Sequence, residues 1–486
     1  MGAKMLQLID ILHGVAPEHY YDATLVPPLR ISDVAIDSRL VVPEALFVAL
    51  VGETVDGHDY VAAAATAGAV VALVAIDKGV ALALQHGWAL VIPGQPIPTQ
   101  WQGPLLIGVP DPLTALQQLA AWHRRRFAPT WVVGITGSVG KTSTKEVVAA
   151  LVSAHLPTLK SPRSYNSEST LPLVALQMDD THQAAVFEMG MYTTGEIALL
   201  AHIAQPNIGI VTTVGPSHLE RMGSIERIAA AKAELIQALP ATGVAILNGD
   251  DERVAAMAEL TVARVVRYGL HADADVRAVD IVPQGLAGTQ FRVLALGIDD
   301  VVHLHAPGLH QVRNLLAGIA VGITIGIPWA TMRTAINNIT QLRFVLYSGI
   351  SNTQIIDDSY NAAPTSMRAA LELLGTVQSR RVAVLGDMRE LGHIEESAHS
   401  EVGQWVAGVA DVLIAVGSRG RWIADGARQA GMTAVSTAPD AQSALAVVRA
   451  QIQPGDCVLI KGSRAMAMEQ IVADLRADGA SESKGS

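Results

Sequence analysis

The stretch WVVGITGSVGKTSTKE, residues 131–146, joins an apolar run to a glycine-rich turn and the start of a helix. The run Trp131–Thr136 is apolar and β-branched, which predicts a buried strand. Gly137 and Gly140 allow successive backbone N–H groups to curl around phosphate oxygens. The start of the following helix adds unpaired donors and a partial positive charge. We therefore predict that this turn binds the phosphates of a nucleotide.

The order of residues in this turn, the phosphate loop, assigns roles to its side chains. Lys141 can reach the β and γ phosphates, and the Thr142 hydroxyl can ligate Mg²⁺. The usual template G-x-x-x-x-G-K-[ST] is varied here, because Ile135 takes the place of the first glycine and Gly134 precedes it. The predicted nucleotide-binding residues are Thr136, Gly137, Ser138, Val139, Gly140, Lys141, Thr142 and Ser143.

The composition of the chain excludes several classes of protein. It has 486 residues, of which 50% are hydrophobic and 16% are charged, as in a folded protein of about three domains. A net charge of -11 argues against nucleic-acid binding and against anchoring to an anionic membrane by charge. The single cysteine, Cys457, excludes an internal disulfide and fits a reducing compartment. We expect a cytoplasmic protein without a membrane anchor, because no apolar stretch reaches ~20 residues.

Three regions follow from the pattern of strands and helices. The first, residues 1–107, has short β-branched runs and one alanine-rich helical segment, which predicts a small α/β domain with little helix. Its expected strands are 33–36, 46–50, 70–76, 89–92 and 105–109, and its expected helix is 60–68. Glycines and prolines near residue 100 indicate the boundary with the next region.

The second and third regions alternate strands with helices, which predicts parallel sheets. In residues 108–326 the expected strands are 131–136, 184–187, 208–213 and 244–247, with antiparallel strands over 265–304. In residues 327–486 they are 354–356, 381–385, 412–416 and 457–460, which is typical of a doubly wound, Rossmann-like sheet.

Two polar side chains follow strands of the second region. Glu188 ends the strand 184–187, and His218 lies in the loop after 208–213. Ligands of open α/β sheets bind at the carboxyl ends of the strands. A carboxylate, an imidazole and the Thr142 hydroxyl could together hold Mg²⁺ or Mn²⁺, with phosphate oxygens completing the shell. By itself His218 would be a surface histidine, but beside the phosphate loop we predict a metal ligand.

Lys232 lies in the predicted helix 224–239, for which Ser224 is a plausible N-cap. A solvated lysine is the commoner case on an amphipathic helix. The alanines around Lys232 are small, however, so the amine could lie in a confined place. A lysine kept partly neutral can react with CO₂ to give a carbamate, which turns a cation into an anion that supports Mg²⁺.

These segments resemble those of the Mur ligase family. The loop variant GxTGSxGKT resembles the ATP-binding loop of Mur ligases and folylpolyglutamate synthetases, which form amides through acyl phosphates. The segment IIDDSYNAAPTSMRAAL, residues 355–371, resembles the DDSYNANP motif of the members that add D-alanyl-D-alanine. The resemblance runs in the same motif order from Ser38 to Val472. It implies a UDP-substrate-binding domain (1–107), a central P-loop ATP-binding domain (108–326) and a C-terminal Rossmann-like ligase domain (327–486).

The resemblance also implies functional residues. Catalytic roles fall to Lys141, His218 and Lys232, the last as a carbamate in the segment AKAEL, and the metal ligands are Thr142, Glu188 and His218. Further nucleotide contacts are Asn314, to the adenine, Arg343, in a shortened hinge segment, and Asp358, to the ribose or to the dipeptide side. Substrate contacts are Ser38, Arg39, Asn166, Glu168, Tyr360, Asn361, Lys461, Ser463 and Arg464.

Several positions depart from the family pattern, among them Ser167, Ser169 and Gln311. Thr170 replaces a glycine in the substrate-facing segment RSYNSESTLPLVAL, and Glu44 replaces a glycine in the first region. If the glycine at 170 served a positive φ, the threonine would alter the loop.

The implied activity is an ATP- and Mg²⁺- or Mn²⁺-dependent ligase that joins D-Ala-D-Ala to UDP-MurNAc-tripeptide, a precursor of peptidoglycan. We expect a monomer without a nucleic-acid partner. Two alternatives stay open at this point. One is a sibling amide ligase with another amine or acceptor. The other is a P-loop regulatory module that hydrolyses ATP without ligation.

Overall fold

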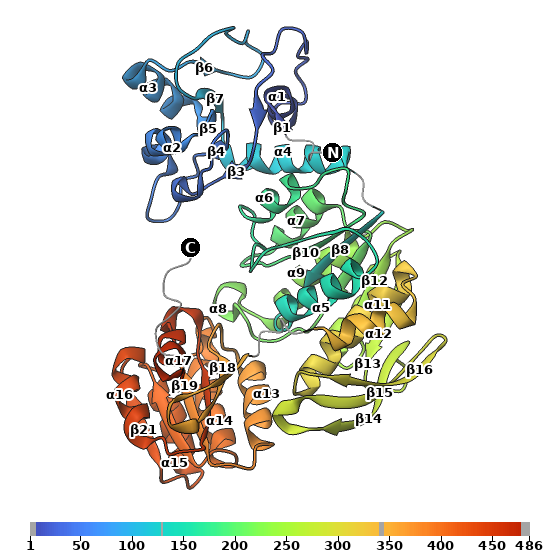
Figure 1. Ribbon diagram of the computed structural model, residues 1–486, viewed down its shortest axis with the longest axis vertical. Coiled ribbons are helices and arrows are strands. Elements are labelled where there is room, and N and C mark those ends of the chain that lie inside the picture. The colour runs from blue at the N-terminus through green and yellow to red at the C-terminus, as the bar shows by residue number, and fades with distance from the viewer. Residues whose placement is uncertain (1–5, 128–129, 340–344, 478–486) are drawn as a thin grey trace. The chain divides into compact units, whose positions relative to one another are not determined.

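The computed structural model describes residues 6–127, 130–339 and 345–477 (Figure 1). Its strands form sheets of five, nine and six strands and one two-stranded ribbon, which confirms the predicted α/β class. By their contacts the residues group into two units. The first comprises Met1–Gly134, Leu156–Gly190 and Glu196–Asn207, and the second comprises Ile135–His155, Met191–Gly195 and Ile208–Ser486.

The five-stranded sheet belongs to the first unit and is parallel throughout. Its order is β3 (Val34–Ala35), β4 (Leu46–Val48), β5 (Val71–Ala75), β7 (Leu105–Val109) and β6 (Leu90–Val91). The residues of β4 and β7 are buried without alternation, as expected for a sheet covered on both faces.

The prediction of little helix in this region was wrong. Besides α2 (Val61–Ala67), the structure has α1 (Leu8–Val15) and α3 (Ile76–His86). The β-branched run 70–76 contains no signal, such as a glycine or proline, for the boundary at which β5 ends and α3 begins. Gly79 belongs to the contact of α3 with the sheet, because a Cβ there would lie 2.9 Å from Val74 Cγ2.

The nine-stranded sheet has the order β16-β15-β14-β13-β12-β11-β8-β10-β9. Its strands are β8 (Trp131–Thr136), β9 (Thr158–Lys160), β10 (Ala184–Glu188), β11 (Ile208–Val211), β12 (Val244–Asn248), β13 (Arg264–Gly269), β14 (Val276–Pro283), β15 (Thr289–Ala295) and β16 (Ile298–Leu304). The predicted antiparallel pairing holds for β14, β15 and β16 but was wrong for β13, which pairs in parallel with both neighbours. A helical connection, residues 252–260, carries the chain from β12 to β13, whereas Gly297, with φ +71°, lies between β15 and β16.

Three helices of the second unit place site residues. The helix α5 (Lys141–Ser153) begins directly after the phosphate loop and lies beside α11 (Leu309–Ile325) (Figure 1). A Cβ at Gly318 of α11 would lie 2.6 Å from Val147 Cγ1, so the helices approach closely. The helix α9 (Ile225–Gln237) has Ser224 as N-cap, which accepts a hydrogen bond from the Arg227 N–H and confirms the prediction.

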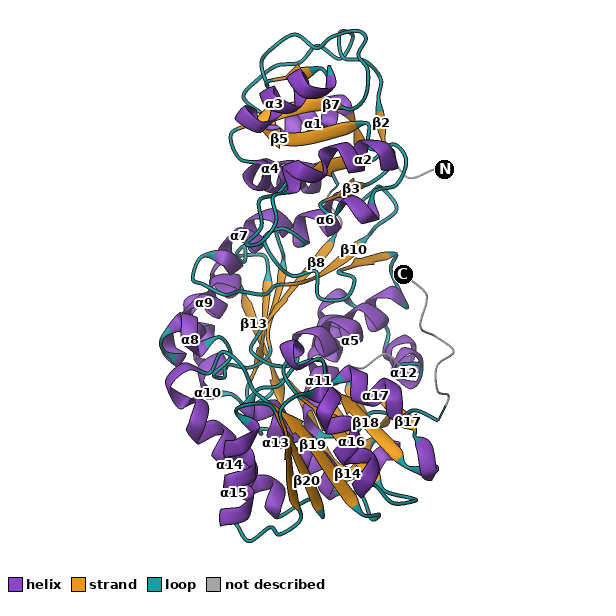
Figure 2. Ribbon diagram, turned by 90° about the vertical axis from the view of Figure 1, so that its left-hand side faces the viewer, coloured by secondary structure: helices purple, strands orange, loops and turns teal. Residues whose placement is uncertain are grey.

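The six-stranded sheet confirms the predicted doubly wound arrangement. Its order is β17 (Val345–Ser348), β18 (Gln354–Asp358), β22 (Cys457–Lys461), β19 (Arg381–Gly386), β20 (Val412–Val416) and β21 (Val435–Ala438). Only the β17–β18 pair is antiparallel within this described sheet. One core forms with α13 (Pro364–Gly375), α14 (Glu395–Ala407) and α15 (Gly420–Gln429), and another with α16 (Ala441–Gln451) and α17 (Glu469–Leu475) (Figure 2).

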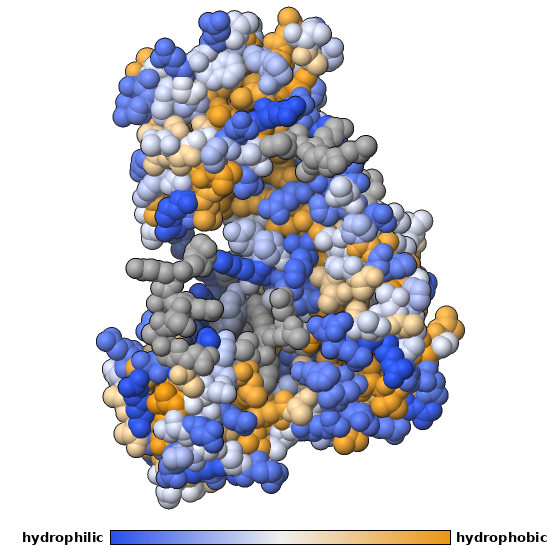
Figure 3. All heavy atoms as spheres, in the orientation of Figure 1, coloured by the Kyte–Doolittle hydropathy of each residue, from blue (hydrophilic) through white to orange (hydrophobic). Residues whose placement is uncertain are grey.

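None of the described helices is long and apolar enough to cross a bilayer. Exposed large apolar side chains such as Leu84, Val262 and Leu296 are scattered along the chain. On the face drawn in Figure 3, hydrophobic residues are interspersed with hydrophilic ones. Cys457 is buried in the core, and burial raises the pKa of its thiol to about 12, so the thiol is unreactive.

The close approach of α14 to α15 gives a test of this packing. A Cβ at Gly403 would lie 2.1 Å from the carbonyl oxygen of Ile423. We expect Gly403→Ala to lower the free energy of unfolding by about 1–3 kcal/mol, measured by urea unfolding followed by circular dichroism. Gly408→Ala, whose nearest contact would be 3.8 Å, is the control and should change it little. A Gly403→Ala protein as stable as the parent would contradict the packing.

Candidate active site

The phosphate loop is fastened to the chain that follows β11. Gly137 has φ +147°, and a Cβ there would lie 1.9 Å from Thr212 Oγ1. The Ser138 N–H donates to the Thr213 carbonyl at 2.8 Å, and the Val139 N–H donates to Thr213 Oγ1 at 3.2 Å. Thr212 in turn donates its hydroxyl to the Val139 carbonyl at 2.6 Å. Only glycine fits at 137, and the loop has little freedom to move.

The second glycine of the loop faces α11. Gly140 has φ +91°, and a Cβ there would lie 3.0 Å from Asn314 Oδ1. The same oxygen accepts a hydrogen bond from Thr144 Oγ1 at 3.1 Å. Asn314 is buried and donates to Gln311 Oε1. Asn314 therefore contacts the phosphate loop at Gly140 and the first turn of α5 at Thr144, a role that was not predicted from the sequence. Its predicted contact with adenine stays a prediction.

Lys141 lies over its own loop. Its Nζ donates to the carbonyl oxygen of Gly137 at 2.7 Å. The residue begins α5, so its ammonium group stands at the N-terminus of a helix, whose first N–H groups have no partner within the helix. A cation and several N–H donors at one place are the chemical requirements of a polyphosphate site.

Lys232 is buried on the inner face of α9, with 2% of its surface exposed. Ile228, Ala231 and Leu235 share that face at helical spacing. Desolvation, together with the nearby positive charge of Lys141, lowers the pKa of Lys232 well below 10.5. No carboxylate in the described residues forms an ion pair with it. The predicted confined position is confirmed, and the amine is held toward its neutral form.

His218 lies at the N-cap of the short helix α8 (Leu219–Met222), with φ +59°. Its Nδ1 pairs with the Oε2 of Glu390, from the loop after β19. This hydrogen bond lowers the pKa of Glu390, although partial burial opposes the shift. The ring of Tyr192 stands edge-on to the imidazole, with 5.2 Å between ring centroids. Glu390 is not among the residues predicted from the sequence.

Glu188 ends β10 in the first unit and is 1% exposed. Its Oε1 accepts a hydrogen bond from Asn166 Nδ2 at 2.8 Å, so two residues predicted for the site are in direct contact. The carbonyl of Glu168 accepts from the Gln117 side chain. Thr170 has φ -100°, an ordinary value, so the threonine brings no backbone strain to this segment.

The predicted metal ligands belong to both units, Glu188 to the first and Thr142 and His218 to the second, and their shared role as ligands stays a prediction. Among residues 6–127, 130–339 and 345–477, no group of three or more His, Cys, Asp or Glu side chains could hold a metal alone. Because His218 Nδ1 faces a carboxylate, the lone pair of the neutral ring lies on Nε2, as metal ligation requires. The donor set is one carboxylate, one imidazole and one hydroxyl, which suits Mg²⁺ or Mn²⁺ bound together with phosphate.

The predicted residues of the C-terminal sheet form a second cluster. The buried Lys461 Nζ donates to Asp358 Oδ2 at 2.6 Å and to the Asn361 carbonyl at 2.8 Å. The guanidinium of Arg464 lies 5.5 Å from the ring centroid of Tyr360. The ammonium of Lys461 is thus engaged by a carboxylate within the protein, and its role toward a dipeptide stays a prediction.

The remaining predicted residues are in three places. Ser463 is buried and accepts a hydrogen bond from the Arg389 N–H at 2.9 Å. Ser38 and Arg39 lie in a 3-10 turn (Ser38–Leu40), where the Arg39 side chain is 86% exposed and pairs with Asp37. Arg343 falls outside the described residues. Glu44 has φ +66°, so the family's glycine at this position suits the backbone better than glutamate does.

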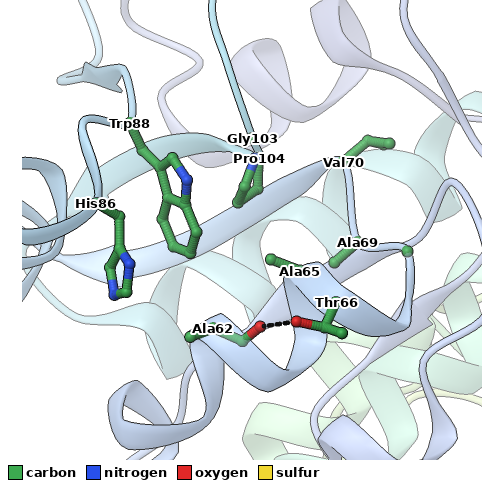
Figure 4. Close-up of a pocket in the computed structure, with 10 residues that line it drawn as sticks. Ala62, Ala65, Thr66, Ala69, Val70, His86, Trp88, Gly103 and Pro104 are labelled. Atoms are coloured by element: carbon green, nitrogen blue, oxygen red, sulfur yellow. Dashed lines mark hydrogen bonds between the residues drawn. The ribbon is translucent and has the colours of Figure 1, made fainter.

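A cavity of about 570 Å³ lies apart from these residues, in the first unit (Figure 4). The ring of Trp88 stacks on that of His86, with 4.3 Å between centroids, and alanines of α2 line the opposite side. None of the predicted site residues lines this cavity.

Comparison with known proteins identifies the family of the chain. Residues 30–123 match the Mur ligase family catalytic domain, residues 135–322 the Mur ligase middle domain, and residues 342–464 the Mur ligase glutamate ligase domain. The UDP-N-acetylmuramoyl-tripeptide–D-alanyl-D-alanine ligase of Bacillus subtilis (strain 168) is 34% identical, over 96% of this chain and 97% of that protein. The Escherichia coli (strain K12) ligase of the same name is 33% identical, over 99% of both chains.

Solved structures give the same result. The structure is similar to that of MurF from Acinetobacter baumannii, with a TM-score of 0.82 and 27% identity over 98% of this chain and 99% of that one. It is also similar to MurF ligase from Thermotoga maritima in complex with ADP, with a TM-score of 0.75 and 25% identity over 90% of this chain and 96% of that one. The chain, with its three matched domains in order, belongs to the Mur ligase family.

Proposed function

We propose that this chain joins D-alanyl-D-alanine to UDP-N-acetylmuramoyl-tripeptide, with ATP cleaved to ADP and phosphate. The observation that carries the proposal is the phosphate loop with Lys141 near the buried amine of Lys232, with which no carboxylate of the described residues forms an ion pair. The full-length similarity to ligases named for this reaction supports the choice of substrates.

In the first step, the terminal carboxylate of the tripeptide attacks the γ-phosphorus of ATP, and ADP leaves with the electrons of the broken P–O bond. Both reactants are anions, so the barrier contains a large repulsion. The phosphate loop amides and the Lys141 ammonium hold the triphosphate and offset part of that repulsion. The product is an acyl phosphate on the tripeptide.

The metal that supports this step would be held by Thr142, Glu188, His218 and the carbamate of Lys232. When bound, Mg²⁺ or Mn²⁺ supplies positive charge that screens phosphate from carboxylate. The chain's own contribution is to hold these ligands in place. Asn166 donates to Glu188, and His218 Nδ1 pairs with Glu390. Burial lowers the pKa of the Lys232 amine and so favours the neutral form, which can react with CO₂.

In the second step, the amine of the dipeptide attacks the acyl carbon, and phosphate leaves from the tetrahedral intermediate. We assign the dipeptide side to Tyr360, Asn361, Ser463 and Arg464, with the Asp358–Lys461 pair beneath them. We assign the uridine diphosphate to Ser38 and Arg39 and the peptide acid to Asn166 and Glu168. Arg39 offers an exposed guanidinium suited to a diphosphate. Water must be excluded, because it would hydrolyse the acyl phosphate.

Product analysis tests the proposal. Mass spectrometry of a reaction with ATP, UDP-MurNAc-tripeptide and D-Ala-D-Ala should find the UDP-MurNAc-pentapeptide, and omission of any one substrate should abolish it. Other amines and acceptors, supplied in parallel, test for a sibling ligase. Phosphate release that does not depend on the muramyl peptide would contradict the proposal and favour an ATP-hydrolysing module. We further infer a monomer in a reducing cytoplasm, which the buried, unreactive Cys457 supports.

Gly137→Ala tests the phosphate loop. The added methyl group would lie 1.9 Å from Thr212 Oγ1, on a backbone with φ +147°, so the loop must shift. We expect ATP affinity, measured by calorimetry, to fall by about 100-fold, because several N–H donors lose their positions together. Gly249→Ala, whose nearest contact would be 3.6 Å, should bind ATP like the parent. Unchanged affinity in Gly137→Ala would refute the assignment.

Lys232→Met tests the buried amine through stability as well as activity. Because the folded pKa of Lys232 is depressed, the unfolded chain binds more protons between that pKa and 10.5, so stability rises with pH in that window. Lys232→Met should remove this slope, raise the free energy of unfolding at neutral pH by ~1 kcal/mol and lower ligation ~100-fold. Urea unfolding at several pH values and product formation measure the two effects.

Two further variants distinguish a carbamate from a simple cation. Lys232→Arg keeps a positive charge but cannot form the carbamate, so it should be as inactive as Lys232→Met. Lys160→Met, at an exposed lysine of β9, is the control for the loss of one charge. Activity retained in Lys232→Arg would show that Lys232 acts as a cation.

A further inference from the structure

Glu390 connects the C-terminal sheet to the predicted metal ligand His218. The Glu390 carboxylate pairs with Nδ1 of His218, although the two residues are 172 positions apart. Neither sequence motifs nor the assignments made above give Glu390 a role in binding ATP or either peptide. It is half-buried, so it is not a free surface carboxylate.

The pairing determines which nitrogen of His218 is available. An ionised carboxylate only accepts hydrogen bonds, so Nδ1 must carry the proton. In a neutral ring, the lone pair then lies on Nε2, and within the described residues Nε2 has no hydrogen-bond partner. A histidine that ligates a metal through one nitrogen and donates to a carboxylate through the other has its ring orientation and tautomer fixed.

The ring of His218 is held on its other sides as well. The edge of Tyr192 contacts it, and the Arg221 guanidinium lies 5.0 Å from the Tyr192 ring centroid. The backbone of His218, with φ +59°, starts α8 in the left-handed region. We therefore expect Glu390 to determine the orientation of the His218 ring, whereas other residues such as Tyr192 also cover it.

Glu390 is itself fixed against α8. Its carbonyl accepts a hydrogen bond from the Glu220 N–H at 3.2 Å, and its φ is +65°. A Cβ at Gly392 would lie 3.1 Å from Glu220 Cα, so the backbones approach closely there. Side chain and backbone of Glu390 thus both contact the segment that carries His218.

The base of this loop is fastened to the C-terminal sheet. Asp387 is buried and accepts from the backbone N–H groups of Arg419 and Gly420 at 3.0 and 2.9 Å. The Ser463 N–H donates to the Asp387 carbonyl, and the Arg389 N–H donates to the Ser463 hydroxyl. The position of Glu390 therefore depends on contacts with the loops that come after β20 and β22.

We propose that Glu390 is a positioning residue that orients His218 for the metal and makes the metal site depend on the docking of the C-terminal sheet. This rests on the proposed function, in which His218 is a metal ligand. Through Glu390, the C-terminal sheet, which carries the residues assigned to the dipeptide, would influence the metal site at which the peptide acid is activated. Activation of the peptide acid would then be favoured only when the domain that brings the amine is in place.

Metal binding and ring tautomer test the proposal without relying on turnover. Mn²⁺ binding to the full-length protein in the presence of ADP is measured by electron paramagnetic resonance, and the tautomer of His218 by ¹⁵N NMR of labelled histidine. Glu390→Ala should weaken Mn²⁺ binding about 10- to 100-fold and mix the two tautomers. Glu390→Gln, which keeps an acceptor oxygen, should restore part of both.

Two controls complete the design. Glu396→Ala removes an exposed carboxylate at the start of α14, and Glu220→Ala keeps the backbone N–H that contacts Glu390. Both should bind Mn²⁺ like the parent. Glu390→Ala with parental Mn²⁺ affinity and a single tautomer would overturn the proposal. If His218→Ala itself binds Mn²⁺ normally, the metal assignment of the proposed function has failed instead.

Discussion

The absence of room for a side chain at Gly137 is the constraint on which the site depends. The loop after β8 lies so close to Thr212 that a single methyl group would overlap its hydroxyl. That closeness lets Thr212 and Thr213 satisfy the polar groups of Ser138 and Val139. The loop after β8 is therefore held by its contacts with the residues after β11, and not by interactions within the loop alone. A phosphate site built in this way is organised before the ligand binds.

The site also contains a group that works against stability. Burying Lys232 without a carboxylate partner in the described structure disfavours its charged form. A chain selected for stability alone would place an apolar side chain on that face of α9. Instead the amine lies where the charge of Lys141 further disfavours protonation. Local conflicts of this kind are expected at functional sites.

The part of the fold that local sequence determines was predictable. The strand Trp131–Thr136, the start of α5 at Lys141 and the strand Val412–Val416 occur where the apolar runs and the glycines indicated. Their signals are continuous and bounded by glycine. The helix α3 was missed, because its beginning continues the apolar run of β5 without a break. The parallel pairing of β13 depends on a connection whose path local periodicity does not reveal.

The residues of the candidate site can likewise be separated into those predicted from the sequence and those recognised only in the structure. Motif order located the phosphate loop, Glu188, His218 and Lys232, because each follows a strand or lies on a helix of clear pattern. The contacts of Asn314 with Thr144 and of Glu390 with His218 join residues 170 and 172 positions apart, and no local pattern records them. Burial of Lys232 was only hinted at by its alanine neighbours. The supporting residues Asn314 and Glu390 could be recognised only from contacts in the structure. The residues predicted to bind the ligands could be proposed from sequence motifs.

The central claim is that the peptide acid is activated as an acyl phosphate at the phosphate loop. Transfer of ¹⁸O tests it most directly. A UDP-MurNAc-tripeptide labelled with ¹⁸O in its terminal carboxylate is converted with ATP and D-Ala-D-Ala, and the released phosphate is examined by mass spectrometry. The account predicts that each phosphate released carries one ¹⁸O from the carboxylate. Unlabelled phosphate accompanying full product formation would contradict it.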